Sequence, residues 1–291
     1  MEWRIRNMAL DSRDTPLWAI VLASEPKPAS GPQPSLFDQT VQRLEPVVSG
    51  DRIVAVVGRG TPRPANAREG VGRKIPARHD RGTAPNVLLA LASILEASPE
   101  ALVLVTPAHH RVHHWRVYQA GLLEAAAALT VAGAEAVAFG MTPLAPIAGC
   151  GWIVPGAVRS AGASRLREVN EFTEAPTVDR AARLFREGGL WNTRVVMAPA
   201  RVLARLYAQH LPDLADVMAR YQQQPSENRG AFLAAAYAAM PAADFFRDLV
   251  SVAGTFAVYT WPASLGWSDL GAPDREWFVW NWAKAQTIGT A

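Results

Sequence analysis

The stretch LWAIVLASEPKP, residues 17–28, decides the fold class of this chain. Its first part, LWAIVLA, is a continuous apolar run of strand length that ends at a polar, proline-containing segment. Such a run suits a strand covered on both faces of a sheet, because a half-exposed strand would alternate apolar and polar residues. Runs of the same kind recur at residues 53–57, 101–106 and 134–141, so the sequence predicts several buried strands.

Helical patterns lie between these apolar runs, at residues 35–44, 86–97 and 115–131. Strand, helix and strand in succession imply right-handed crossovers. We therefore expect an α/β fold with a Rossmann-like, mostly parallel sheet flanked by helices.

Ligands of such sheets collect at the carboxyl ends of the strands, where Ser24, residues 107–110 and Asn192 should lie. After Trp191 the pattern becomes helix-rich. The elements expected there are helices at residues 200–210, 214–223 and 229–239, a strand at 255–260 and an aromatic helix at 273–283.

Composition limits the class of protein. A chain of 291 residues, 49% hydrophobic and 19% charged, can bury a large core as one big domain or two closely packed ones. The net charge of +3 is too small to imply a nucleic-acid partner. No run approaches the roughly 20 apolar residues that cross a membrane, and no apolar signal core opens the chain, so we expect a cytoplasmic location. The single cysteine, Cys150, excludes an intrachain disulfide framework.

Ordered fragments of the sequence resemble the sugar-1-phosphate nucleotidyltransferases, in particular the mannose-1-phosphate guanylyltransferase (GDP-mannose pyrophosphorylase) branch. The helix SLFDQTVQRL (residues 35–44) follows the first strand as in that family. Six further fragments appear in the family's order: DRGTAPN (80–86), PAHH (107–110), AGCGWI (148–153), FTEAP (172–176), LWNTR (190–194) and GWSDLG (266–271).

The resemblance implies the nucleotide-diphospho-sugar transferase fold with a helix-rich lid on the sugar side. It implies one domain over residues 1–291, with a nucleotide-side half at about 15–145 and a sugar-side half and lid at about 146–291. The carboxyl-terminal β-helix or cupin of longer members is not expected.

The resemblance also assigns binding residues. Gly82, Thr83 and Ala84 would contact the nucleotide base through their backbone, although as a helix start they have an equally good structural role. The sugar would contact Gly149, Gly151, Glu174 and Asn192. The structural alternative is a simple turn for the two glycines, and a cap or a surface position for Glu174 and Asn192.

The triphosphate side departs from the family pattern. The glycine-rich phosphate loop is replaced by SEPKP, in which Lys27 remains, and the lysine expected after Glu174 is Ala175. Phosphoryl transfer depends on positioning and on charge neutralisation by cations, normally including Mg²⁺. His109 stands where the family has a metal-binding aspartate, and imidazole is a poor ligand for Mg²⁺. Asp269 in GWSDLG remains, which suggests weak metal binding or none by the usual route.

Three other features allow more than one interpretation. The basic segment 59–81 is either a solvated loop or an anion-facing replacement for the lost phosphate loop. The pattern HHxxHH at residues 109–114 suggests zinc, but no cysteine or acidic residue lies nearby in the sequence, so a solvated or hydrogen-bonded cluster is favoured. Aromatic residues at 277–282 suggest core packing plus an oligomer interface.

Three functions follow from the sequence. The favoured one is a catalytically silent family member that binds a sugar nucleotide or sugar phosphate, alone, as a homo-oligomer or in complex with an active paralogue. The second is an active, divergent guanylyltransferase that makes GDP-mannose from mannose 1-phosphate and GTP, with Mg²⁺ as cofactor. The third is a scaffold protein without a ligand.

Overall fold

A computed structural model describes residues 16–23, 34–58, 71–76, 81–131, 134–159, 166–225 and 227–271. Three features of the sequence lie outside these ranges: Ser24 and Lys27, most of the basic segment, and the aromatic helix expected at 273–283.

The elements of the first half follow the expected alternation. Helix α1 begins after Ser35, whose hydroxyl oxygen accepts a hydrogen bond from the Asp38 backbone N–H at 3.1 Å. The elements are β1 (Leu17–Ala23), α1 (Leu36–Leu44), β2 (Ile53–Val57), β3 (Arg73–Pro76), α2 (Thr83–Ala97), β4 (Leu102–Pro107), β5 (His110–Val112), α3 (Trp115–Val131) and β6 (Ala136–Met141).

The second half mixes strands and helices. The three helices expected after Trp191 are present, each within two residues of its expected bounds. The elements are β7 (Trp152–Val158), β8 (Leu166–Thr173), α4 (Val178–Arg186), β9 (Leu190–Pro199), α5 (Ala200–His210), α6 (Pro212–Gln222), α7 (Arg229–Ala239), β10 (Phe256–Trp261) and β11 (Trp267–Asp269). A π-helical turn at Phe246–Val250 precedes β10.

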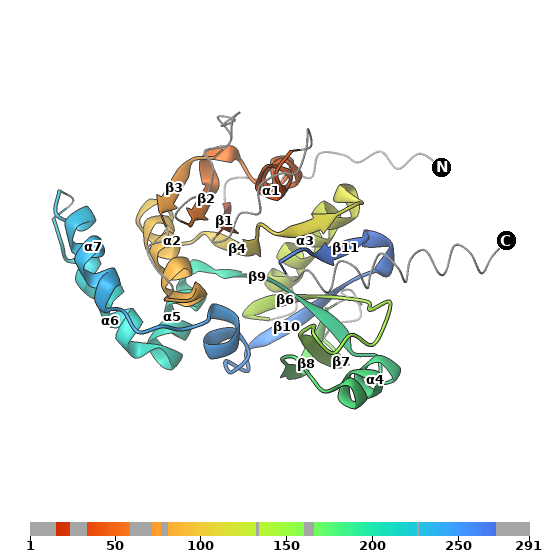
Figure 1. Ribbon diagram of the computed structural model, residues 1–291. Helices are drawn as coiled ribbons and strands as arrows, with labels where there is room; N and C mark the ends of the chain where they lie inside the picture. The colour runs from red at the N-terminus through yellow and green to blue at the C-terminus, as the bar shows by residue number, and fades with distance from the viewer. Residues whose placement is uncertain are drawn as a thin grey trace.

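In the described part of the chain, nine strands form one sheet in the order β3-β2-β1-β4-β9-β6-β10-β8-β7 (Figure 1). Strands β3, β2, β1 and β4 pair in parallel, as do β6 and β10. Strand β9 is inserted antiparallel between β4 and β6, and β8 runs antiparallel to β10 and β7. The expected α/β class is confirmed, with antiparallel pairings at β8 and β9.

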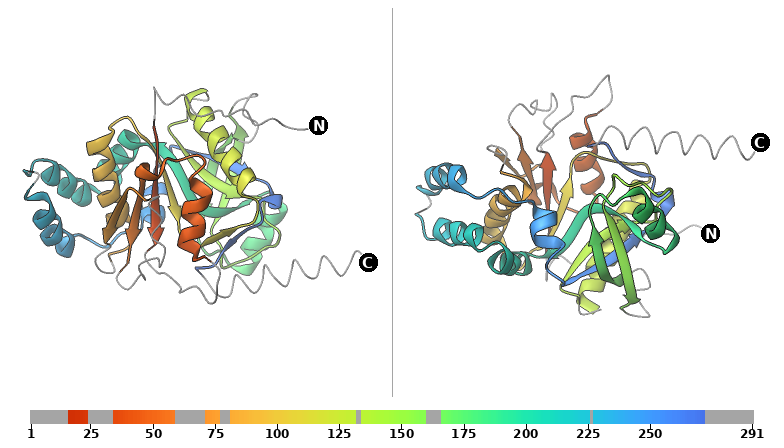
Figure 2. Two further views of the ribbon diagram at one scale, coloured as in Figure 1. Left: turned by 90° about the horizontal axis from the view of Figure 1, so that it is seen from above. Right: turned by 60° about the horizontal axis from the view of Figure 1, so that its bottom comes forward.

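Alternation along the central strands explains why they are apolar throughout. Ile20 of β1 packs into a core on one face of the sheet, whereas Ala19 and Val21 pack into a second core on the other face. Helices α2 and α5 cover the first face, and α1 and α3 cover the second (Figure 2). Both faces are therefore buried, which is the condition that favours a continuous apolar strand.

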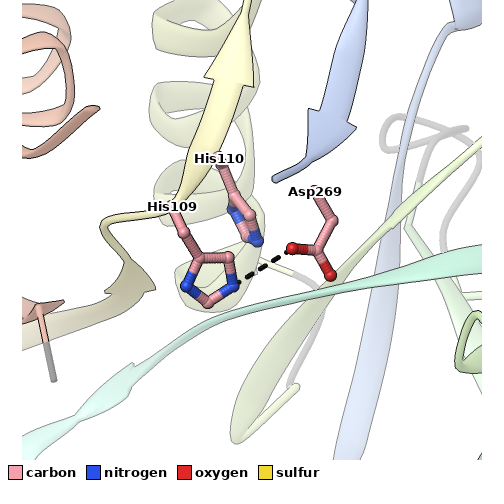
Figure 3. A group of neighbouring side chains, drawn as sticks. All are labelled: His109, His110 and Asp269. Carbon is pink, nitrogen blue, oxygen red and sulfur yellow. Dashed lines mark ion pairs between the residues drawn. The ribbon is translucent and has the colours of Figure 1, made fainter. Parts of the chain in front are cut away.

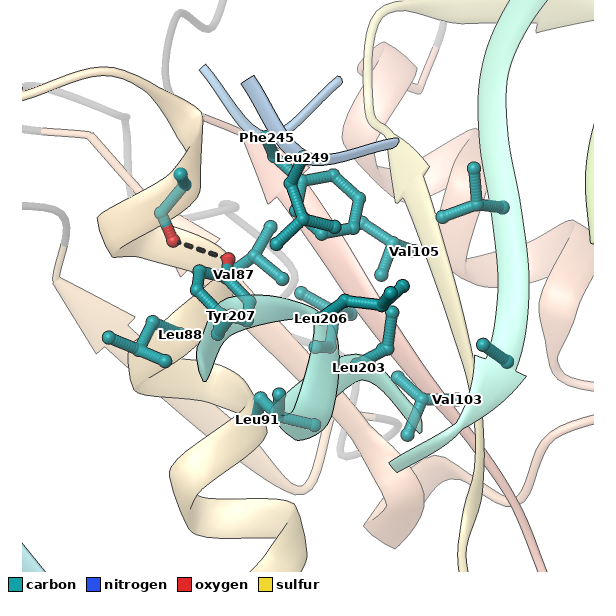
Figure 4. Packing of buried hydrophobic residues seen from close by; sticks show 14 of the residues in the cluster. Val87, Leu88, Leu91, Val103, Val105, Leu203, Leu206, Tyr207, Phe245 and Leu249 are labelled. Atoms are coloured by element: carbon teal, nitrogen blue, oxygen red, sulfur yellow. Dashed lines mark hydrogen bonds between the residues drawn. The ribbon is translucent and has the colours of Figure 1, made fainter. Parts of the chain in front are cut away.

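The three helices α5, α6 and α7 lie elsewhere than expected. The resemblance placed a helix-rich lid on the sugar side, yet α5 and α6 pack against α2, and α7 packs against α6 (Figure 1). Their buried side chains, among them Leu203, Leu206 and Tyr207, join the core formed by α2 (Figure 4). The antiparallel strand β9 causes this, because it carries the chain back along β4 before α5 begins.

Two short strands occur in segments that the sequence predicts as loops. Strand β3 lies within the basic segment and pairs in parallel with β2, with three of its four residues exposed. Strand β5 follows the turn at residues 108–109 and pairs antiparallel with β11 in a separate two-stranded sheet. An exposed edge strand and a three-residue strand have no apolar periodicity to predict them.

Among the described residues, no helix combines the length and the apolar character needed to cross a membrane.

Candidate functional site

Among the described residues, His109, Asn192 and their neighbours lie at one edge of the sheet. Strand β4 ends at Pro107, next to His109, and β6 ends at Met141. Because β9 runs antiparallel to β6, its first residues lie beside the last residues of β6, with Asn192 opposite Gly140. Asn192 thus reaches the expected edge at the start of a reversed strand rather than at the end of a parallel one.

The β5–β11 ladder brings GWSDLG onto the PAHH segment. Asp269 lies opposite His110, and the Leu270 backbone N–H donates to the His109 carbonyl at 3.0 Å. The His109 Nε2 atom lies 3.2 Å from Asp269 Oδ1 (Figure 3). The His109 side chain is 39% exposed and that of Asp269 is 11% exposed. The two positions that the resemblance assigns to the metal therefore meet in space.

His110 completes this cluster, and in the sequence it stands only within the HHxxHH pattern, for which zinc is the less favoured interpretation. It is buried, and its ring stands edge-on to His109 and to Trp267, with centroids 5.0 and 5.2 Å away. One donor atom each from His109, His110 and Asp269 lie within 4.8 Å of one another. The sequence shows no acidic residue near the histidines, because Asp269 is distant along the chain. His113 and His114 are exposed.

The buried guanidinium of Arg43 contacts the backbone of His110 in this cluster. Its Nη1 donates to the His110 carbonyl at 3.1 Å, and it lies 5.3 Å from the centroid of the Tyr118 ring. Burial lowers the pKa of Arg43 from its ordinary value, and Tyr118 opposes that effect. This contact ties β5 to α1 and so fixes the position of His110.

Gly151, Glu174 and Asn192 form a second cluster at the same edge. The Asn192 backbone N–H donates to the Gly151 carbonyl at 2.8 Å, and Asn192 Nδ2 lies 3.4 Å from Glu174 Oε1. A Cβ atom on Gly151 would lie 2.9 Å from Glu174 Oε1, so only glycine leaves room for this approach. Gly149 lies two residues earlier, exposed in the preceding turn.

Arg194 joins this second cluster and was not predicted from the sequence. Its Nη2 lies 2.6 Å from Glu174 Oε2, and its backbone N–H donates to Asn192 Oδ1 at 2.9 Å. The guanidinium carbon lies 5.9 Å from the centroid of the Phe246 ring. The available signal was the arginine at the last position of LWNTR, where the family motif has glycine.

Backbone strain coincides with the second cluster. In the described part of the chain, the non-glycine residues with positive φ are Ala175 (39°) and Arg194 (56°). One follows Glu174 directly and the other lies two residues after Asn192. Strained backbone persists only where the surrounding structure holds it in place, and such residues concentrate at functional sites.

The segment Gly82–Ala84 uses its hydrogen-bonding groups within the fold. Thr83 Oγ1 donates to Asp244 Oδ2 and accepts from the Phe245 N–H, both at 2.8 Å. The Ala84 N–H donates to the Ala243 carbonyl at 3.0 Å. These contacts support the structural role considered for this helix start, and its nucleotide role stays a prediction.

Curated proteins with similar sequences include alginate biosynthesis proteins and a mannose-1-phosphate guanylyltransferase. The alginate biosynthesis protein AlgA of Pseudomonas syringae pv. tomato is 29% identical over 204 residues, 68% of this chain and 41% of that protein. Mannose-1-phosphate guanylyltransferase of Sinorhizobium fredii is 26% identical over 206 residues, 68% of this chain and 38% of that protein. The chain thus spans about two fifths of the length of these curated relatives.

A solved structure resembles this chain in both fold and sequence. The Thermus thermophilus protein described as mannose-1-phosphate geranyltransferase matches with a TM-score of 0.74 and 27% identity, over 88% of this chain and 76% of that one. The family model described as nucleotidyl transferase matches residues 65–281. The protein therefore belongs to the nucleotidyl transferase family, and within it resembles mannose-1-phosphate guanylyltransferase.

Proposed function

We propose that this chain is a catalytically silent family member that binds a sugar nucleotide or sugar phosphate. The observation that carries the proposal is the contact between His109 and Asp269. A Mg²⁺ site built on these two positions would need oxygen ligands from both. An imidazole at one of them leaves a single carboxylate, which is a poor basis for holding the ion beside a triphosphate.

The loss of this metal site bears directly on turnover. Removing one electrostatic contact to a transition state typically costs about 10²- to 10³-fold in rate. This chain lacks the second carboxylate, the glycine-rich loop and the lysine at position 175. Their combined absence supports a binding role in preference to catalysis.

The sugar-side cluster supports the binding role. Glu174 supplies a carboxylate for sugar hydroxyls, and the buried Asn192 adds an amide, with Gly151 leaving space beside both. Arg194 supplies a partly exposed guanidinium, 2.6 Å from the carboxylate. We propose that the Arg194 guanidinium binds a phosphate oxygen of the ligand in place of the Glu174 carboxylate. Glu174 can then accept hydrogen bonds from the sugar hydroxyls.

The proposal includes the other expected properties of the chain. The ligand would be a small molecule, with no nucleic-acid partner and no resident metal required for binding it. Self-association or a complex with an active paralogue, and a cytoplasmic location, remain expectations.

Calorimetric titration with GDP-mannose, mannose 1-phosphate and GTP tests this function. We expect GDP-mannose to bind more tightly than GTP, and Glu174→Ala or Asn192→Ala to weaken GDP-mannose binding by about tenfold or more, because a sugar hydroxyl left unpaired in the complex costs about 1–3 kcal/mol. Glu171→Ala is a matched control, because Glu171 is a half-exposed glutamate of β8 that pairs with Arg180. Binding that is indifferent to Glu174 and Asn192 would refute the assignment of the cluster.

Turnover decides between the silent member and the active alternative. With mannose 1-phosphate, GTP and Mg²⁺, the purified protein should make no detectable GDP-mannose. A rate above about 1 s⁻¹, ordinary for an enzyme, would establish the divergent guanylyltransferase instead. If none of these ligands raises the unfolding temperature, the scaffold function is supported, because a ligand that binds only the folded state stabilises it.

A further inference from the structure

We propose that His109, His110 and Asp269 form a binding site for a transition-metal ion of the Zn²⁺, Co²⁺ or Ni²⁺ class. The inference is independent of the proposed sugar-nucleotide function, because it concerns the donor atoms of this cluster alone. Figure 3 shows the three side chains turned toward one another from β5, the turn before it and β11.

The distances suit such an ion. Two ligands that are each about 2.0–2.2 Å from a tetrahedral zinc ion lie roughly 3.4 Å apart. His109 Nε2 and Asp269 Oδ1 are already 3.2 Å apart, and the three donors lie within 4.8 Å of one another. Because 4.8 Å exceeds this spacing by about 1.4 Å, the wider pairs must close by up to about 1.4 Å when an ion binds.

The donor set selects the class of metal. Two imidazole nitrogens and one carboxylate oxygen suit Zn²⁺, Co²⁺ and Ni²⁺, whereas Mg²⁺ prefers oxygen ligands and an octahedral shell. Three protein ligands leave a coordination position for water or a ligand oxygen. His109, at 39% side-chain exposure, is the ligand of the three that an incoming ion can reach from solvent.

The surroundings hold two of the three ligands in place. The Gly271 backbone N–H donates to Asp269 Oδ1 at 2.9 Å, which orients the carboxylate. A Cβ atom on Gly271 would lie 2.9 Å from the His109 ring, so glycine permits the ring to approach. Arg43 donates a hydrogen bond to the His110 carbonyl and so fixes the backbone of that ligand. These contacts reduce the ordering that an ion must impose when it binds.

The test uses the full chain without a polyhistidine tag, stripped of metal with a chelator. Zn²⁺ is titrated by calorimetry, and Co²⁺ by its visible absorption spectrum. We expect one site for each ion, undisturbed by millimolar Mg²⁺. His109→Gln and Asp269→Asn should each weaken Zn²⁺ binding by roughly tenfold or more, because the loss of an outer-shell partner alone typically costs about 10- to 100-fold in affinity. Both residues are incompletely buried, so these variants avoid the folding risk of changing His110.

The double variant His113→Gln, His114→Gln is the matched control, since it removes two neighbouring histidines that are exposed. It should bind Zn²⁺ as the wild type does. The proposal is overturned if the control loses binding as strongly as His109→Gln, or if the wild type binds no Zn²⁺ and the histidine–aspartate contact is only an ion pair. It is also overturned if Mg²⁺ binds as tightly as Zn²⁺.

His109→Asp provides a second, independent measurement. It changes the donor set from two nitrogens and one oxygen to one nitrogen and two oxygens. We expect a gain in Mg²⁺ or Mn²⁺ affinity and a changed Co²⁺ spectrum. Unchanged metal binding would show that positions 109 and 269 do not share an ion.

Discussion

At the scale of single residues, the cluster of Gly151, Glu174 and Asn192 depends on the absence of a side chain at Gly151 and on a strained backbone at Arg194. Gly151 leaves space for the Glu174 carboxylate, and Arg194 adopts a left-handed backbone that non-glycine residues rarely adopt. Neither feature improves stability in an obvious way. Both place polar groups next to Asn192, which is the reason to test them by binding.

Gly151→Ala should damage binding more than stability. The new methyl group would lie 2.9 Å from Glu174 Oε1 and 3.3 Å from Asn192 Cβ, so the carboxylate must move. We expect GDP-mannose affinity to fall by about tenfold or more by calorimetry, with a small change in unfolding temperature. Gly156→Ala is the control, because its methyl group would crowd Asn170 Oδ1 at 2.5 Å and Glu168 Cβ at 3.0 Å, both on β8, and would not approach Glu174 or Asn192. Equal effects of both variants would contradict this prediction.

Arg194→Gly separates the backbone role of this residue from its charge. Glycine relieves about 1–2 kcal/mol of left-handed strain, while it loses a half-exposed ion pair worth about 0–1 kcal/mol and adds about 0.5–1 kcal/mol of unfolded-state entropy. Stability should therefore change by less than about 1 kcal/mol in denaturant unfolding.

Ligand binding should respond more strongly to Arg194→Gly. If the guanidinium binds phosphate, affinity for mannose 1-phosphate falls while that for unphosphorylated mannose does not. Tighter binding of both ligands would mean that Arg194 blocks Glu174 instead. Arg194→Lys, which keeps a positive charge, should retain part of the affinity.

At the scale of elements, the contact between α2 and α5 shows how the relocated helices are held. Tyr207 of α5 is fully buried, and its hydroxyl donates to the Ala84 carbonyl at 2.7 Å, at the start of α2. Burial raises the pKa of Tyr207 well above its ordinary value of 10, and the nearby charge of Asp244 adds to that effect.

This raised pKa predicts a loss of stability in alkali. A group whose pKa is higher in the folded state stabilises the fold fully below its unfolded pKa, and this contribution is lost as pH rises above about 10. Tyr207→Phe removes the titrating hydroxyl, so its unfolding temperature should decline less between about pH 9 and about pH 11 than that of the wild type. At about pH 7 the variant should be destabilised by about 0.5–1.5 kcal/mol, the usual net contribution of one hydrogen bond, because the Ala84 carbonyl loses this side-chain donor. Parallel declines in both proteins would contradict the assignment.

At the scale of the whole molecule, the two expected halves are interleaved in one sheet. Strand β9 of the second half lies between β4 and β6 of the first, and β10 pairs with β6. Neither half can complete its part of the sheet alone. One domain stays a prediction, and this shared sheet is the reason to test it.

Calorimetry and fragments test the single-domain prediction. The chain should unfold in one transition, with equal calorimetric and van't Hoff enthalpies. Fragments cut between residues 145 and 146 should each lack native near-ultraviolet circular dichroism, and β9 should form only when both are present. Two separate transitions, or a fragment that folds alone, would show that the halves are independent.

The sequence by itself determined the elements whose burial is periodic or continuous. Strand β1 was predicted with its observed bounds, as were β2, α3, α5 and α7. Apolar runs and helical periodicity report how a segment is buried, so they locate core elements reliably. The pairing of positions 109 and 269 was also expected, but only from the resemblance, since nothing local connects residues so far apart.

Tertiary structure decided which elements meet. Local patterns carry no information on a partner, so the insertion of β9, the packing of α5 and α6 on α2, and the addition of His110 to Asp269 were not predictable from them. Strands β7 and β8 carry too many half-exposed residues for a continuous apolar run. Arg194 acquires its role only because the chain returns to Glu174 through a strained turn. The core elements follow from hydrophobic burial along the chain, whereas the candidate sites follow from contacts between segments that only the folded sheet brings together.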